Sequence, residues 1–266
     1  MLRALIASRL VTPPAIWGKL PGHADFVRSG MRHDESEGWR PWLAQLRVAG
    51  EGGQPERAAI PTAFVLPPGA LAFASRRFVL GVITPSADRV GRHHPLLVYH
   101  LAHPRWVERH FAAHAQRPRD WLFWLARAVA RHAGRQGTAD MHMLQRTVWG
   151  LWRLHEPGLT DIWDRRRAGA LSTGPASAGD RARPKAGTPS SPDRVQSLLD
   201  KLAGPAPAND PAAGLHGVRH LPWADWPQRL QRSRPDSAFW QQDAAGGFVN
   251  AANRLQQLWS GTSWAP

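Results

Sequence analysis

The 266-residue chain contains no cysteine. This absence excludes disulfides, iron–sulfur clusters, cysteine-ligated zinc sites and thiol nucleophiles, and it leaves reducing and oxidising compartments both open. Long hydrophobic runs are also missing, since no stretch approaches the roughly 20 apolar residues that a membrane span needs. The apolar run at the N-terminus is broken by Arg9 before it reaches the length of the hydrophobic region of a signal peptide. We therefore expect a cytoplasmic protein without direct membrane insertion.

Acidic residues are scarce in this chain. It has 34 Lys and Arg against 20 Asp and Glu, which gives a net charge of +14 and a pI near 11.6. Such a charge suits nucleic acid, anionic lipid or an acidic protein surface, and charge alone does not choose among them. The hydrophobic content of 42% and the 14 Trp are typical of a folded protein, because disordered chains are poor in large apolar residues.

Short apolar runs bounded by Pro and Gly predict strands, and apolar residues three or four positions apart predict helices. The predicted strands begin at Ala15 and cover residues 62–66, 78–83, 96–101, 215–221 and 237–241, with 62–66 paired to 78–83. The predicted helices cover the Trp39 to Leu46 region and residues 106–114, 121–132, 193–202 and 250–259. Residues 141–154 fit a strand or a helix, and their type stays open.

Strands followed by helices and then by strands again predict an α+β fold, in which helices cover an antiparallel sheet on at least one face. We expect a single main domain. Residues 12–165 form its first region, and residues 193–266 form a helix-strand-helix region that completes it. Between them, residues 166–192 are rich in Arg, Pro, Gly and Ser, a composition typical of a flexible linker.

The sequence motifs of common enzymes are missing. The chain has no Gly-Lys-Ser/Thr phosphate loop, no Gly-x-Gly-x-x-Gly fingerprint and no Gly-x-Ser-x-Gly elbow. His110 and His114 are four residues apart on a predicted helix, but no carboxylate accompanies them in a metalloprotease pattern, so we expect a structural or surface role. Ser86, Asp88 and a histidine could form a nucleophilic triad only by a geometry that the sequence does not give.

Two aspartates lie in turns marked by Pro or Gly. Asp25 follows the first predicted strand and Asp88 precedes the fourth. An aspartate oxygen that accepts backbone N–H groups fixes a tight loop, and Arg89 or Arg92 could add an ion pair to Asp88. We expect these aspartates to be turn caps, and the alternative is that their loops form an edge that faces a protein partner.

A basic segment offers a second hypothesis about function. Its arginines, together with nearby tryptophans, could bind the backbone and bases of a nucleic acid. No base-reading module accompanies them, so a solvated linker is the favoured interpretation. The arginines are Arg165, Arg166, Arg167, Arg181 and Arg183.

Three stretches together resemble the TagF/ImpM family of type VI secretion-associated proteins. Residues 17–27, WGKLPGHADFV, are similar to the opening Gly-Lys-Leu-Pro-x-x-Gly-Asp-Phe-Val signature of that family. The segment SADRVGRHHPL at 86–96 is similar to the family's Ser-x-Asp-x-Val-Gly-Arg-x-Phe-Pro-Leu pattern, and SAFW at 237–240 is similar to its Ser-x-Trp-Trp strand. The chain departs from these patterns at Ala24, His94 and Phe239, where the family usually has Gly, an aromatic residue and Trp.

The resemblance implies a longin-like α/β domain that regulates assembly of the secretion system after translation, typically by repression. It implies a forkhead-associated-domain protein as partner, no catalytic residues, no metal and no cofactor. Association with nucleic acid stays an alternative. The candidate contact residues are Gly18, Lys19, Leu20, Pro21, Asp25, Phe26, Ser86, Asp88, Arg89, Gly91, Arg92 and Trp240.

Overall fold

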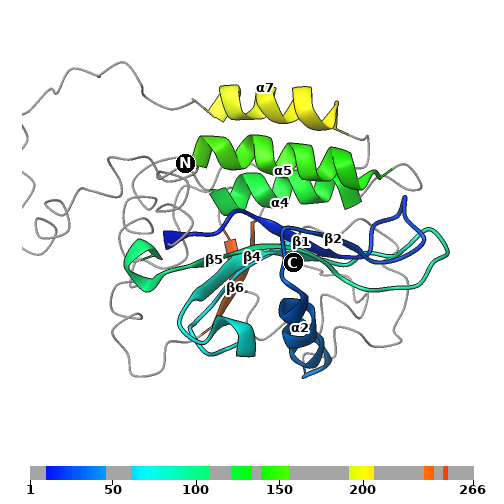
Figure 1. Ribbon diagram of the computed structural model, residues 1–266. Coiled ribbons are helices and arrows are strands. Elements are labelled where there is room, and N and C mark those ends of the chain that lie inside the picture. The colour runs from blue at the N-terminus through cyan, green and yellow to red at the C-terminus, as the bar shows by residue number, and fades with distance from the viewer. Residues whose placement is uncertain are drawn as a thin grey trace, which may run out of the picture.

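A computed structural model describes residues 10–45, 61–107, 121–133, 139–155, 192–206, 237–242 and 248–250. Within these ranges an antiparallel sheet of seven strands, in the order β2-β1-β5-β4-β3-β6-β7, lies between helices on both of its faces (Figure 1). The predicted α+β class with an antiparallel sheet is therefore confirmed. The strands are β1 (Ala15–Gly18), β2 (Val27–Ser29), β3 (Thr62–Leu66), β4 (Phe78–Thr84), β5 (Leu96–Ala102), β6 (Ala238–Gln242) and β7 (Phe248–Asn250).

The central strands are buried on both faces. Every residue of β3, β4 and β5 is buried, and the three strands are rich in β-branched and large apolar residues, as strands covered from both sides usually are. Along β3 the side chains alternate, so that Val65 belongs to one core and Phe64 and Leu66 to the other. The pairing of β3 with β4 is confirmed, and its register joins Phe64 to Gly81.

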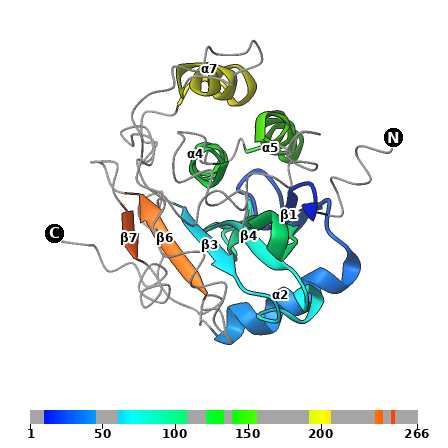
Figure 2. The same cartoon turned by 90° about the vertical axis from the view of Figure 1, so that its left-hand side faces the viewer.

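Three helices lie on one face of the sheet: α4 (Trp121–Ala133), α5 (Met141–His155) and α7 (Pro192–Ala203) (Figure 2). They bury apolar side chains such as Leu125, Leu151 and Leu199 in a core shared with the sheet. The Arg131 side chain on α4 is 2% exposed, and its Nη1 donates to Asp200 on α7 at 2.6 Å and to the Gly204 carbonyl at 3.0 Å. Helix α7 is thus held by an ion pair as well as by apolar packing.

The opposite face carries α2 (His33–Gln45) and the 3-10 helix η1 (Ala72–Ala74). Trp39 of α2 is fully buried against Phe64 and Tyr99, with ring centroids 5.8 and 5.0 Å away. The Tyr99 hydroxyl donates to Glu35 Oε2 at 2.7 Å, which anchors the first turn of α2 to the centre of the sheet.

Most of the predicted elements are confirmed where the structure describes them. Strands β1, β3, β4, β5 and β6 and helices α2, α4 and α7 lie where the sequence predicts them, and residues 141–154 belong to a helix. The prediction of a closing helix from Asn250 is wrong at that residue, because Asn250 pairs with Trp240 as part of β7. Residues 166–191 of the linker predicted at 166–192, the strand at 215–221 and residues 108–114 lie outside the described residues, and Pro192 belongs to α7. No described helix combines the length and the apolar character needed to cross a membrane.

Candidate functional site

Two loops meet at one end of the sheet. Residues 19–26 connect β1 to β2 and residues 85–95 connect β4 to β5. Since β1 pairs with β5 in antiparallel fashion, the end of β1 lies beside the start of β5, and both loops extend beyond the sheet at the right of Figure 1. The sheet thus brings together two motifs that are far apart in the sequence.

Gly18 lets the two loops approach each other closely. Its φ is +136°, and a Cβ at this position would lie 2.1 Å from the Pro95 carbonyl oxygen. Any other side chain would collide with the backbone of the second loop at its entry into β5. The glycine of the first motif is therefore required by packing against the second motif.

Asp88 is the centre of the contact between the loops. Its side chain is fully buried, and its Oδ1 accepts the backbone N–H groups of Val90 and Arg92 at 3.1 and 2.9 Å. Its Oδ2 lies 3.0 Å from Lys19 Nζ and 2.7 Å from Arg92 Nε. The expected turn cap is present, and Arg92 rather than Arg89 supplies the neighbouring ion pair.

Burial by itself would raise the pKa of the Asp88 carboxyl. The hydrogen bonds from the Arg92 backbone and from the side chains of Lys19 and Arg92, with the charge of Lys19, outweigh burial and hold this pKa well below its ordinary value. Asp88 therefore stays ionised, and its ion pair with Lys19 holds the two loops together. Both of its oxygens are occupied, so it presents no carboxylate to a substrate.

Lys19 is the buried partner of this carboxylate. Only 8% of its side chain is exposed, and Nζ also donates to the Arg92 carbonyl at 3.1 Å. The ammonium lies 5.4 Å from the centre of the Phe26 ring. The ammonium group of Lys19 is thus bound by contacts inside the protein.

Backbone groups add further ties between the loops and to helix α5. Arg92 Nη2 donates to the Ala24 carbonyl at 2.5 Å, and the Arg89 N–H donates to the His23 carbonyl at 2.8 Å. His23 Nε2 accepts the N–H of Met141 at 3.0 Å, which joins the first loop to the first turn of α5. His23 was not among the residues singled out in the sequence. Its partner on the helix lies 118 positions away, so no local sequence pattern predicts this contact.

An aromatic cluster covers the ion pair. Trp17, Phe26 and His94 lie with ring centroids 4.7 to 5.9 Å apart. Burial lowers the pKa of His94 to about 4, and the charges of Lys19 and Arg40 act in the same direction, whereas the hydrogen bond to the Pro95 carbonyl raises it. His94 is therefore neutral at pH 7 and packs as an aromatic ring between Trp17 and Phe26.

The remaining sequence candidates fall into three groups. Leu20 is fully buried and supports the loop from within, whereas Pro21 is half-buried and begins the turn of the first loop. The Ser86 hydroxyl is buried without a hydrogen-bond partner among the described residues, so it lacks the contact with a base that a nucleophilic triad requires. Trp240 is 3% exposed in β6, and β6 pairs with β3 rather than lying at the loops, so Trp240 belongs to the core.

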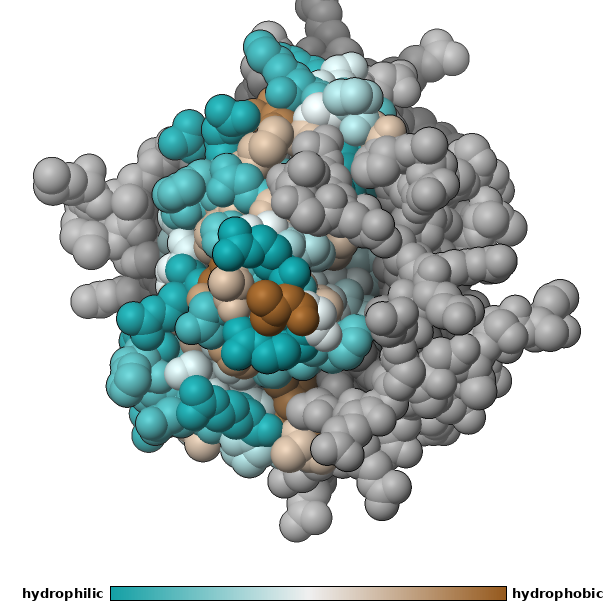
Figure 3. Space-filling view, turned by 90° about the vertical axis from the view of Figure 1, so that its right-hand side faces the viewer, coloured by the Kyte–Doolittle hydropathy of each residue, from teal (hydrophilic) through white to brown (hydrophobic). Residues whose placement is uncertain are grey.

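The outward side of the loops is formed by Asp25, Phe26, Arg89, Val90 and Arg92, which we call the loop-tip surface. Phe26 is 45% exposed and Val90 is 64% exposed, and both are among the large hydrophobic side chains that the structure leaves open to solvent. Asp25 Oδ1 caps the N–H of Phe26 at 2.8 Å. Figure 3 faces this end of the molecule and shows a small hydrophobic patch surrounded by hydrophilic residues.

The arrangement is suited to holding a surface in shape. Lys19 and Asp88 neutralise each other below the surface, while the side chains of Phe26, Arg89 and Val90 face solvent. Gly91 has a φ of +85°, and a Cβ added there would meet no atom within 4 Å, so a left-handed turn presents Val90 at the tip of the loop. Among the described residues no group of three or more potential ligands could hold a metal ion, and His110 and His114 lie outside them.

Comparison with known proteins identifies the family. Residues 15–149, just over half of the chain, match the family described as the TagF N-terminal domain, type VI secretion system-associated. Among solved structures the chain is similar to PA0076 from Pseudomonas aeruginosa PAO1, with 25% identity and a TM-score of 0.38. That similarity covers 55% of this chain and 63% of that protein. No match was found among curated proteins.

Proposed function

Because the chain belongs to the TagF family of type VI secretion system-associated proteins, we propose that it is a non-enzymatic regulator of this system. In this proposal it acts in the cytoplasm, binds a scaffold protein that carries a forkhead-associated domain, and thereby represses assembly of the secretion apparatus. The loop-tip surface makes the contact with the scaffold.

The observation that carries the proposal is that the two family motifs contain both buried charged residues and exposed residues at the loop tip. Lys19 and Asp88 are buried and form an ion pair with each other, so they stabilise the loops and do not face a reactant. Val90, in contrast, has an exposed side chain at the loop tip and is flanked by the exposed arginines Arg89 and Arg92. We take this exposed apolar side chain with its charged rim as the contact, because protein interfaces combine an apolar centre with a polar rim.

The surface also suggests the chemistry of its counterpart. The exposed Arg89 beside an apolar side chain fits an acidic rim around an apolar depression, whereas Arg92 already donates Nε to Asp88 and Nη2 to the Ala24 carbonyl. Arginine binds carboxylates through paired N–H groups and is common at the centres of interfaces. We therefore expect the scaffold to present Asp or Glu side chains around the position that receives Val90.

The experiment compares two substitutions of exposed apolar residues in the full-length tagged chain, expressed in its native host. Val90→Asp places a charge at the centre of the loop-tip surface. Leu154→Asp places the same charge on α5, where Leu154 is 37% exposed, and is the matched control. We expect Val90→Asp to lose capture of the scaffold and to release secretion from repression, while Leu154→Asp behaves like the wild type.

Two results would contradict the proposal. If Val90→Asp captures the scaffold and represses secretion as well as the wild type does, the loop-tip surface is not the interface. If the wild-type chain recovers no secretion-system component, the regulatory function itself is wrong. Recovery of nucleic acid alone, lost as salt is raised, would favour the alternative of a nucleic-acid-associated module.

A further inference from the structure

A second candidate site lies at the end of the sheet opposite the loop-tip surface. Strand β4 begins there at Phe78 and β5 ends there at Ala102, while the two motif loops occupy the other ends of these strands. A cavity of about 570 Å³ is formed at this end by the segment before β1, the start of α2, residues 73–77 and strand β5. Its volume is in the range of cavities that hold a ligand or several side chains.

The cavity has an excess of positive charge. Arg32, Arg76 and Arg77 line it, and Glu35 is the carboxylate among its lining residues. Arg32 and Glu35 neutralise each other, since Glu35 Oε1 lies 3.1 Å from Arg32 Nε, and Arg32 Nη2 also lies 3.4 Å from Asp34 Oδ2. Glu35 Oε2 accepts a hydrogen bond from the Tyr99 hydroxyl at 2.7 Å. The excess positive charge of the cavity therefore comes from Arg76 and Arg77. Arg76 is exposed and forms no ion pair with the rest of the described chain.

The floor of the cavity is held in place by rigid elements. Tyr99 belongs to the central strand β5 and is 1% exposed, and Glu35 belongs to the first turn of α2 and is 5% exposed. Burial raises the pKa of the Tyr99 hydroxyl, and the charge of Glu35 raises it further, so the hydroxyl stays protonated and keeps donating to Glu35. The floor of the cavity is therefore fixed by contacts within the protein.

The walls are largely apolar. Pro13, Phe73, Leu101 and Trp149 line the cavity beside the arginines. A ligand that fits such walls carries an apolar group next to its negative charge. A free inorganic anion would leave the apolar surface without a partner.

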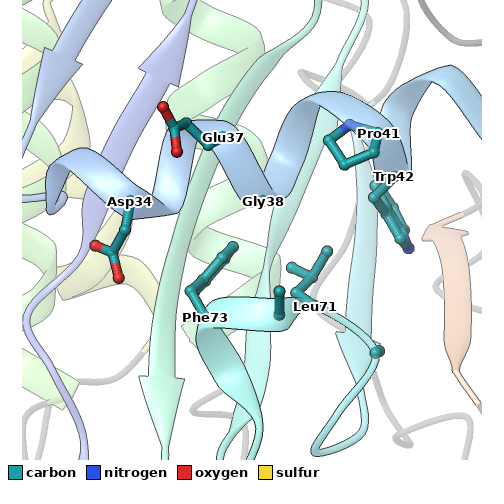
Figure 4. A pocket seen from close by; sticks show the side chains of 9 residues that line it. Asp34, Glu37, Gly38, Pro41, Trp42, Leu71 and Phe73 are labelled. Atoms are coloured by element: carbon teal, nitrogen blue, oxygen red, sulfur yellow. The ribbon is translucent and has the colours of Figure 1, made fainter.

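A neighbouring hollow provides a contrast. It measures about 460 Å³ and lies between α2 and η1, where Asp34 and Glu37 replace the arginines. Phe73 lines both spaces, and Figure 4 shows its ring below Gly38 of α2 with Asp34 to one side (Figure 4). The two hollows are thus adjacent and similar in their apolar lining, but they differ in the sign of their charge.

We propose that the cavity lined by Arg32, Arg76 and Arg77 binds an acidic segment of a protein partner, in which a glutamate side chain is flanked by apolar residues. The planar guanidinium of Arg76 pairs with the carboxylate, because arginine presents N–H donors in the spacing of two carboxylate oxygens. The flanking apolar side chains contact Phe73 and Leu101. This site does not depend on the loop-tip surface and adds a second point of attachment.

The test is a titration of the full-length chain, followed by amide NMR signals. The probes are leucyl-glutamyl-leucine blocked at both ends, the same tripeptide with glutamine in place of glutamate, and free glutamate. We expect the acidic tripeptide to give saturable shifts of the Gly30 and Ser75 amides. The glutamine tripeptide should bind about fivefold more weakly, because a charged hydrogen bond is replaced by a neutral one.

Two charge reversals locate the interaction. Arg76→Glu should weaken binding of the acidic tripeptide by at least about tenfold, because it replaces the attraction with repulsion. Arg194→Glu changes the net charge equally at an exposed position of α7 and should leave binding unchanged. The comparison separates a local site from general attraction to a chain of charge +14.

Several outcomes would overturn the proposal. They are the absence of saturable shifts, equal binding of the glutamate and glutamine tripeptides, and equal weakening by the two reversals. Shifts that map to the hollow lined by Asp34 and Glu37 would also contradict it. If free glutamate binds as tightly as the acidic tripeptide, the cavity takes a small acid and the assignment to a protein segment is wrong.

Discussion

Replacing Asp88 with asparagine tests the idea that this carboxylate ties the two loops together. Asparagine has the same size and keeps an oxygen for the backbone N–H groups of Val90 and Arg92, so the turn cap is retained. The substitution removes the negative charge opposite Lys19 and Arg92. The effect therefore reports on the charge and not on the shape of the side chain.

The magnitude follows from the exposure of the two cations. The Lys19 side chain is only 8% exposed, and leaving it without its anion costs about 2 to 3 kcal/mol. The Arg92 side chain is 60% exposed, so solvent screens it and its share is about 0.5 kcal/mol. We expect Asp88→Asn to lower the free energy of unfolding by about 3 kcal/mol.

The dependence on pH gives an independent check. The pKa of Asp88 is held below its ordinary value in the folded protein, so the unfolded chain takes up a proton first as pH falls. The stabilisation is fully present above the unfolded pKa of about 3.9 and is lost as pH falls below it toward the folded pKa. The difference between wild type and Asp88→Asn should be constant above about pH 5 and should narrow below about pH 4.

Urea unfolding followed by tryptophan fluorescence and circular dichroism measures the loss of unfolding free energy and its dependence on pH. Asp25→Asn is the control, because Asp25 is exposed and caps one N–H group. It should cost less than about 1 kcal/mol. A double variant, Asp88→Asn with Lys19→Met, should recover part of the loss because it removes the unpaired buried cation. A loss below about 1 kcal/mol for Asp88→Asn, or one that is the same at pH 3 and pH 7, would refute the reasoning.

Three further predictions concern other contacts. His100 packs among Trp106, Trp121 and Trp152, and burial there lowers its pKa to about 3. His100→Phe should therefore reduce the stability that is lost as pH falls from about 6.5 to about 3. Urea midpoints of the variant that fall as steeply over this range as those of the wild type would contradict this. Asp200→Ala leaves the buried Arg131 without its anion and should cost about 2 to 3 kcal/mol in urea unfolding, whereas a neutral result would show that the other contacts of Arg131 suffice. Gly91→Ala forces an L-residue into a left-handed conformation and should lower thermal stability by about 1 kcal/mol, and an unchanged melting temperature would mean that the loop relaxes.

Helix and strand types follow from local sequence where a pattern is strong. The apolar runs at 62–66 and 78–83 fix β3 and β4, and the spacing of Trp39 and Leu43 predicts α2, because burial of one face of an element depends on residue spacing within it. Two edge strands were not predicted. Strands β2 and β7 are each three residues long, too short for alternation to be recognised.

By itself, the sequence determined the family, the class of fold and the local chemistry of the turns. The sequence predicted that Asp88 caps its loop and that Arg89 or Arg92 pairs with it, and the structure selected Arg92. These features depend on short-range geometry, which the order of residues specifies directly. The resemblance of residues 17–27 and 86–96 to family motifs likewise needs no coordinates.

Only the tertiary structure decided which distant residues meet. It placed Lys19 against Asp88, His23 against the start of α5, and Trp240 in the core rather than at the loops. It also joined Arg76 and Glu35 in one cavity. The physical reason is that these contacts arise from the pairing of β1 with β5 and the packing of helices on both faces of the sheet, and no local pattern encodes either.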